Sequence, residues 1–97
     1  MERVIYLNNL YDLYGELLTE TQKKYFEDYY FNNLSYGEIA EKYNISRNAS
    51  FKQLKIIEEK LENFEKILKL LYKKNKINDI IDKVEDSKIK RELEDLF

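Results

Sequence analysis

The stretch LSYGEIAEKYNIS, residues 34–46, combines a short amphipathic segment, a turn residue and a residue suited to beginning a second helix. Ser35 and Glu38 have the spacing of a capping box, in which each side chain bonds the other residue's backbone amide. Asn44 is of the residue type that, after glycine, best tolerates a left-handed backbone. Ser46 can then cap the second helix. The stretch therefore predicts two helices joined by a tight turn.

This order of residues is typical of a helix-turn-helix, which we expect within about residues 35–62. Ala40 is small enough for the second helix to cross closely above it, and Ile45 anchors the turn in the core. In this register Ser50 and Leu54 point inward. The outward-facing residues are the candidate nucleic-acid-binding site: Ser46, Arg47, Asn48, Phe51, Lys52 and Lys55.

Each of these residue types has a defined chemistry at a nucleic acid. Arg47 and Asn48, at the start of the second helix, would address guanine and adenine edges. Lys52 and Lys55 would contact phosphates, and Phe51 could touch a thymine methyl or stack on an unpaired RNA base. Because three cations are few, this face predicts weak binding with a shallow salt dependence. The alternative is an ordinary solvated surface.

Composition excludes several classes of function. The 97 residues contain no cysteine, histidine or proline, and the net charge is −2. Thiol nucleophiles, disulfides, zinc fingers and imidazole bases are therefore absent. The two glycines lie apart, so no glycine-rich phosphate loop exists. We expect no enzyme activity, no metal and no cofactor. Without an apolar run long enough for a membrane span or signal peptide, a cytoplasmic location is the simplest interpretation.

The absence of proline favours an all-α fold, which we expect to form a single helical domain over residues 1–97. A first helix is predicted over residues 2–14, ending or kinking at Gly15. Its predicted inward stripe is Tyr6, Leu10, Leu13 and Leu17. Thr19 and Gln22 form another capping box, before a helix that reaches about Phe31. The aromatic residues of that helix, Phe26, Tyr29 and Tyr30, are predicted to lie in the core.

Downstream, one long helix is predicted over about residues 47–75, because no helix-breaking residue interrupts it. Its apolar residues follow a heptad pattern: Leu54, Ile57, Leu61, Phe64, Leu68 and Leu71. A homodimer is predicted through the lower part of this seam, at Leu61, Phe64, Leu68 and Leu71. The rival is pairing within the chain with residues 2–18 and the tail. Two closing helices are expected at residues 77–84 and 88–97, the second capped by Ser87.

Residues 10–68, about two-thirds of the chain, resemble the YlxM-like family of bacterial proteins. The resemblance rests on LYDLY (10–14), LLTETQ (17–22), LSYGEIAEKYNISR (34–47) and KLENFEK (60–66). It implies a helix-turn-helix similar to the promoter-reading domain of sigma factors. The family's genes typically lie beside those for the signal recognition particle protein Ffh and its receptor FtsY, which implies a role in that pathway. Ser50 and Phe51 stand where the family usually has Val and Tyr, which predicts a less firmly anchored second helix and the loss of one phenol.

Two functions remain open from the sequence. The first is a regulatory or accessory protein of the signal recognition particle pathway that binds DNA or the particle's RNA. The alternative is a protein-interaction module that binds Ffh or FtsY and retains the helix-turn-helix as a scaffold. The overall acidity fits a basic protein partner. The lysines of residues 66–76 could face RNA or protein, or form a solubilising helix surface.

Overall fold

A computed structural model describes residues 1–96, which form six α-helices and one short 3-10 helix without any strand. The elements are α1 (Glu2–Tyr14), η1 (Gly15–Leu17), α2 (Glu20–Tyr30), α3 (Tyr36–Tyr43), α4 (Arg47–Leu68), α5 (Leu70–Ile81) and α6 (Ser87–Glu94). The all-α prediction is confirmed.

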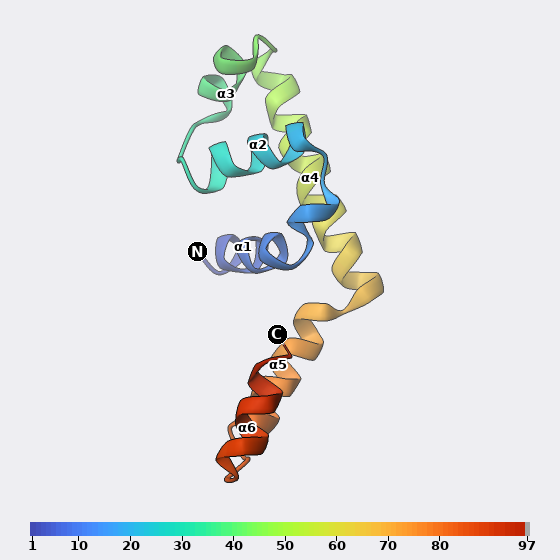
Figure 1. Cartoon of the computed structure of the whole chain (residues 1–97). Coiled ribbons are helices and arrows are strands. Elements are labelled where there is room, and N and C mark those ends of the chain that lie inside the picture. Colours follow the sequence, from blue (N-terminus) through green and yellow to red (C-terminus); the bar gives the residue numbers. More distant parts are fainter. Residues whose placement is uncertain (97) are drawn as a thin grey trace.

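The helices form a packed body and a projecting arm. α1, α2 and α3 pack against α4, with α1 and α2 running across its direction, while α5 and α6 extend away from the body as a helical hairpin (Figure 1). The extents are 55 × 25 × 23 Å and the radius of gyration is 16.9 Å. A compact domain of this length would have a radius of gyration of about 13 Å. The arm therefore adds length and surface rather than core.

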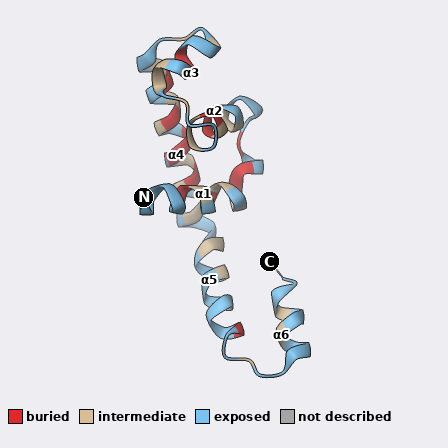
Figure 2. Cartoon of the chain, turned by 90° about the vertical axis from the view of Figure 1, so that its left-hand side faces the viewer, coloured by how far each residue is buried: buried red, intermediate tan, exposed pale blue. Residues whose placement is uncertain are grey.

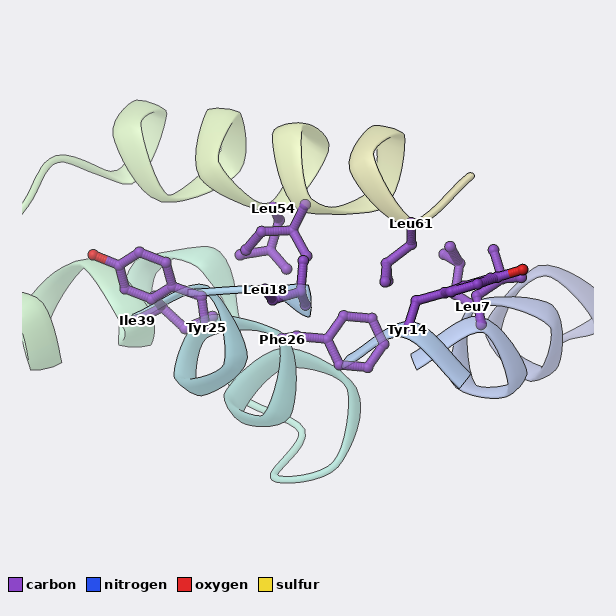
Figure 3. Packing of buried hydrophobic residues seen from close by; sticks show 10 residues of the cluster. Leu7, Tyr14, Leu18, Tyr25, Phe26, Ile39, Leu54 and Leu61 are labelled. Atoms are coloured by element: carbon purple, nitrogen blue, oxygen red, sulfur yellow. The ribbon is translucent and has the colours of Figure 1, made fainter. Parts of the chain in front are cut away.

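The core lies between α4 and the three helices before it. Leu54, Ile57 and Leu61 of α4 are fully buried, facing residues from α1, α2 and α3 (Figure 3). Burying one such side chain contributes roughly 1.5–3 kcal/mol. Buried residues are concentrated in the body, and α6 contains none (Figure 2). Folding of the body therefore supplies most of the apolar burial.

The predicted inward stripe of α1 is right for Leu10 and Leu13 and wrong for Tyr6 and Leu17. The buried apolar residues are Leu7, Leu10, Tyr14 and Leu18, and Leu13 packs partly buried against them. Leu13 is half-buried, whereas Tyr6 and Leu17 are 38% and 53% exposed. Apolar residues occur on all sides of α1, so its sequence alone does not determine which face of the helix packs against the core. Packing on α4 selects the stripe, and the 3-10 turn at Gly15–Leu17 brings Leu18 inward in place of Leu17.

The capping box before α2 is confirmed. Gln22 N donates to Thr19 Oγ1 over 3.1 Å, and Thr19 N donates to Gln22 Oε1 over 3.0 Å. Phe26 is fully buried, while Tyr29 and Tyr30 are half-buried against the core cluster, as the helical spacing predicted.

The single long helix predicted over residues 47–75 is wrong, because α4 ends at Leu68 and the chain bends at Lys69. Lys69 has the left-handed backbone angles φ 55° and ψ 33°. The Glu65 carboxylate accepts hydrogen bonds from Leu71 N (2.9 Å) and Tyr72 N (3.1 Å), which caps the start of α5. Tyr14 Oη donates to Glu65 Oε1 (2.7 Å) and accepts from Leu70 N (3.0 Å). Contacts distant in sequence therefore terminate the helix.

The bend also divides the predicted heptad seam. Leu61 is fully buried within the chain, and Phe64 and Leu71 pack partly buried against the core. Of the four residues assigned to a dimer interface, only Leu68 is exposed, at 43%. The upper part of the seam is thus covered by the chain's own helices. Leu61 cannot serve a dimer of this fold, and dimerisation itself stays a prediction.

The closing helices differ from their predicted bounds. α5 begins at Leu70 rather than near residue 77, because the break falls at Lys69. α6 is capped by Asp86 and not by Ser87: Asp86 Oδ1 accepts from Lys88 N (2.9 Å) and Ile89 N (3.1 Å). Phe97, assigned to the last helix, lies outside the described residues.

Candidate nucleic-acid interface

The turn between α3 and α4 has the predicted geometry. The capping box of Ser35 and Glu38 is present at the start of α3. Asn44 has φ 55° and ψ 48°, and Ile45 N donates to Ala40 O over 3.0 Å. This bond spans the left-handed residue and closes the end of α3. The chain therefore reverses sharply and enters α4 at Ser46.

α4 is anchored on α3 at its first turn. Ser46 Oγ accepts a hydrogen bond from Ala49 N over 3.0 Å, so Ser46 is the cap that the sequence predicted. Ser50 is fully buried, with its hydroxyl 2.7 Å from the carbonyl oxygen of Tyr36 in α3 and 2.8 Å from that of Arg47. The loss of anchoring expected from a serine here is thus offset by a hydrogen bond between the two helices.

The candidate residues lie together on the exposed N-terminal half of α4. Ser46, Arg47, Asn48 and Lys52 are exposed, and Phe51 is 41% exposed. Neither Arg47 nor Lys52 forms an ion pair with any part of the chain that the structure describes. These two cations are therefore available to a ligand.

Lys55 differs from the other candidate cations. Its Nζ lies 3.3 Å from Glu58 Oε1 and 5.2 Å from the centroid of the Phe51 ring. The Glu58 side chain is only 3% exposed, and its other oxygen accepts a hydrogen bond from Tyr30 Oη (2.7 Å). Lys55 thus compensates a buried carboxylate and offers less charge to a phosphate than the sequence indicated.

Phe51 belongs to an aromatic cluster that fixes its orientation. Its ring meets that of Tyr36 edge to face, with the centroids 5.2 Å apart, and Tyr36 stacks on Tyr29 at 4.9 Å. Burial, and then a hydrogen bond with Tyr29, raise the pKa of Tyr36 to about 12. The Tyr36 phenol therefore stays neutral at physiological pH. A ring held in this way loses little conformational freedom on binding a ligand.

Sequence reasoning missed Asp28, a buried carboxylate that ties α2 to α3. It accepts hydrogen bonds from Tyr43 Oη (2.5 Å), Lys42 Nζ (3.0 Å) and Asn32 Nδ2 (3.0 Å). Burial alone would raise the pKa of Asp28, but bonds from Tyr43, Asn32 and Lys42 outweigh it and hold the pKa below its ordinary value. No local pattern in the sequence distinguishes this residue from a surface aspartate.

Within residues 1–96, no group of acidic side chains is arranged to hold a metal ion. The same residues contain no helix both long enough and apolar enough to cross a membrane.

A capped α3, a left-handed turn and an exposed second helix define an all-α helix-turn-helix protein. Comparison with known families agrees: the chain belongs to the UPF0122 family, described as "Putative helix-turn-helix protein, YlxM / p13 like", whose model matches residues 1–96. The resemblance noted in the sequence is therefore confirmed. This description is not that of an enzyme class.

Proteins of several bacteria are similar to this chain over most of its length. The chain is 38% identical over 87 residues to the UPF0122 protein BH2485 of Halalkalibacterium halodurans, covering 90% of this chain and 80% of the relative. It is 42% identical over 80 residues to a UPF0122 protein of Thermoanaerobacter sp., covering 82% and 68%. It is 38% identical over 86 residues to the UPF0122 protein YlxM of Bacillus subtilis, covering 89% and 78%.

Proposed function

We propose that this protein is a regulatory or accessory factor of the signal recognition particle pathway that binds DNA or RNA through the N-terminal half of α4. The observation that carries the proposal is the exposed, unpaired state of Arg47 and Lys52 on a helix anchored by the turn. The amide groups at the start of α4 add a partial positive charge at the same end. The pathway, and with it the cytoplasmic location, rests on the YlxM-like family's association with Ffh and FtsY.

On this proposal each residue keeps the role that its chemistry favours. Arg47 pairs with guanine and Asn48 with adenine, while Lys52 contacts a phosphate. Phe51 provides apolar contact, and Lys55 contributes little because of Glu58. Because two cations are unpaired, a plot of the logarithm of duplex affinity against the logarithm of salt concentration should have a slope of about −2.

The test is a fluorescence-anisotropy titration with duplex DNA from the gene's own upstream region and with signal recognition particle RNA. The variant Arg47→Ala should weaken selective binding roughly fivefold or more, since a bidentate base contact is worth about 1–3 kcal/mol. The control, Lys83→Ala, removes one exposed charge after α5 and should leave binding unchanged. Equal affinities for Arg47→Ala, the control and the unaltered protein would refute the assignment of α4.

The pairing of Lys55 with Glu58 favours a second candidate function, a protein-interaction module that binds Ffh or FtsY. An exposed aromatic ring beside Arg47 and Lys52 is the composition of a protein-binding hot spot as well as of a base reader. Titration of Ffh against labelled protein separates the two functions. Binding to Ffh that weakens with Phe51→Ala, with free nucleic acid ignored, would favour the interaction module.

We also propose a homodimer, which would double the cations presented to a two-fold site. Because Leu61 is buried, the contact would use the outer side of the bend, where Ile67 and Leu68 are 68% and 43% exposed. Light scattering at tens of micromolar measures the mass directly. A monomer that persists at the highest soluble concentration would contradict this proposal.

A further inference from the structure

The largest run of positive charge lies across the end of α4 and the first turns of α5, beyond the helix-turn-helix. Residues 66–76 contain five lysines and no acidic residue, in a chain whose net charge is −2. None of the five forms an ion pair with the residues that the structure describes. By contrast, the candidate face on α4 offers two unpaired cations. More unpaired cations are therefore presented by residues 66–76 than by the candidate face on α4.

Four of these lysines share one side of the molecule. Lys69, Lys73 and Lys76 recur at helical spacing, and Lys66 and Lys69 line a cleft of about 720 Å³ together with Tyr72. Tyr72 is 57% exposed, and Lys76 Nζ lies 5.7 Å from the centroid of its ring. We call Lys66, Lys69, Lys73, Lys76 and Tyr72 the α5 basic strip.

Lys74 lies elsewhere and marks the limit of the strip. It faces the α1 side, where it lines a separate hollow with Asn9 and Asp12. Three glutamates also line this cleft. Glu62 pairs with Arg3 at 2.8 Å and Glu65 accepts the amides at the start of α5, whereas Glu59 is exposed and forms no ion pair within the part of the chain that the structure describes. Figure 2 shows that α5 stands clear of the body over most of its length. The strip is therefore open to a ligand.

We propose that the α5 basic strip binds an unpaired nucleic-acid strand independently of the helix-turn-helix. Successive lysines at i, i+4 and i+7 are about 6 and 4.5 Å apart along the helix, so they can contact neighbouring phosphates of one strand. The exposed Tyr72 ring, set among these cations, supplies a surface on which a base stacks. A tyrosine ring among cations also suits a protein partner. The choice of nucleic acid therefore rests on the spacing of the lysines, which matches successive phosphates, and polyglutamate is the competitor that tests it.

The test uses the full chain and labelled oligouridylate or oligothymidylate of about six nucleotides, a length within the ~4–16 nucleotides of known single-strand sites and too short to reach α4's N-terminal half as well. The slope of the logarithm of affinity against the logarithm of salt concentration should become shallower by about 2 in the variant Lys66→Gln/Lys73→Gln/Lys76→Gln. Each of the three lost phosphate contacts accounts for roughly 0.7 of this change. The control Lys74→Gln/Lys83→Gln/Lys88→Gln removes the same net charge from the arm but spares the strip. It should bind as the unaltered protein does. Circular dichroism checks that both variants remain helical.

Tyr72→Ala should weaken single-strand binding about fivefold or more and leave duplex binding unchanged. Three results would each overturn the proposal: equal losses in the two triple variants, no loss in the strip variant, or polyglutamate binding as tightly as the oligonucleotide. The double variant Arg47→Ala/Lys52→Ala distinguishes this inference from the proposed function. It should retain single-strand binding, so failure at α4 and failure at α5 are measured separately.

Discussion

Replacing Glu65 by alanine should loosen the bend that joins the arm to the body. The carboxylate accepts hydrogen bonds from Leu71 N at 2.9 Å, from Tyr72 N at 3.1 Å and from Tyr14 Oη at 2.7 Å. A lost helix cap costs roughly 0.5–2 kcal/mol, and a hydrogen bond to a charged group contributes roughly 1.5–3 kcal/mol. Because water can reach the Tyr72 amide, we expect a net loss of about 2 kcal/mol.

Substitution at the bend itself should act in the opposite direction. Lys69 holds a left-handed backbone at φ 55°, which costs a non-glycine residue roughly 1–2 kcal/mol. Glycine escapes this penalty but adds about 0.5–1 kcal/mol of conformational entropy to the unfolded chain. Lys69→Gly should therefore stabilise the fold by about 0.5–1 kcal/mol.

Urea unfolding followed by circular dichroism measures both effects, and Glu59→Ala, an exposed position on α4, is the matched control. For a domain of this size the Glu65→Ala loss corresponds to a Tm lower by roughly 8–16 °C. Small-angle scattering should also show a radius of gyration different from 16.9 Å. A loss no larger than that of the control, with unchanged scattering, would refute the idea that this carboxylate holds the bend.

Three further substitutions test the body. Asp28→Ala should lower the free energy of unfolding by about 2 kcal/mol, because its partners lose a buried acceptor. Folding lowers the pKa of Asp28, so the carboxylate should stabilise the fold fully above pH 3.8, and acid unfolding should show that contribution being lost below this pH. Burial, and then the hydrogen bond to Glu58, raise the pKa of Tyr30, so the free energy of unfolding should fall as the pH rises above 10. In urea unfolding at alkaline pH, Tyr30→Phe should make this fall with pH less steep. Ser50→Val should destabilise by about 1 kcal/mol, since the Tyr36 carbonyl loses its donor; equal or greater stability would show that valine packing outweighs the hydrogen bond.

Capping and turn residues in the sequence predicted the helix-turn-helix part of the fold. Ser35 with Glu38, Asn44 and Ser46 each act through backbone groups within a few residues, so their spacing was enough to place α3, the turn and the start of α4. The break at Lys69 has no such signal, because it depends on Tyr14 and Glu65 meeting in the folded chain. Contacts between residues so far apart in the sequence cannot be predicted from helix propensity or from the periodicity of apolar residues.

The candidate site was predictable in its placement but not in its charge. The register that put Ser50 inward also put Arg47 and Lys52 outward, as the structure has them. The loss of Lys55 to Glu58 could not be foreseen, since Glu58 at three residues' distance looks like a solvated helix pair. Its burial depends on the Tyr30 hydroxyl, which comes from another helix.

The distance between the two basic surfaces constrains how they could act together. α4 has 22 residues, so Arg47 and Lys69 lie about 33 Å apart along its axis. At 3.4 Å for each phosphate along one strand, this is about ten nucleotides of helical nucleic acid. A shorter ligand can engage only one surface, whereas a longer one can gain from both by effective concentration. Whether it does depends on the direction of α5, which the Glu65 cap and the bend at Lys69 set. The bend that terminates α4 thus governs whether a ligand meets one basic surface or two.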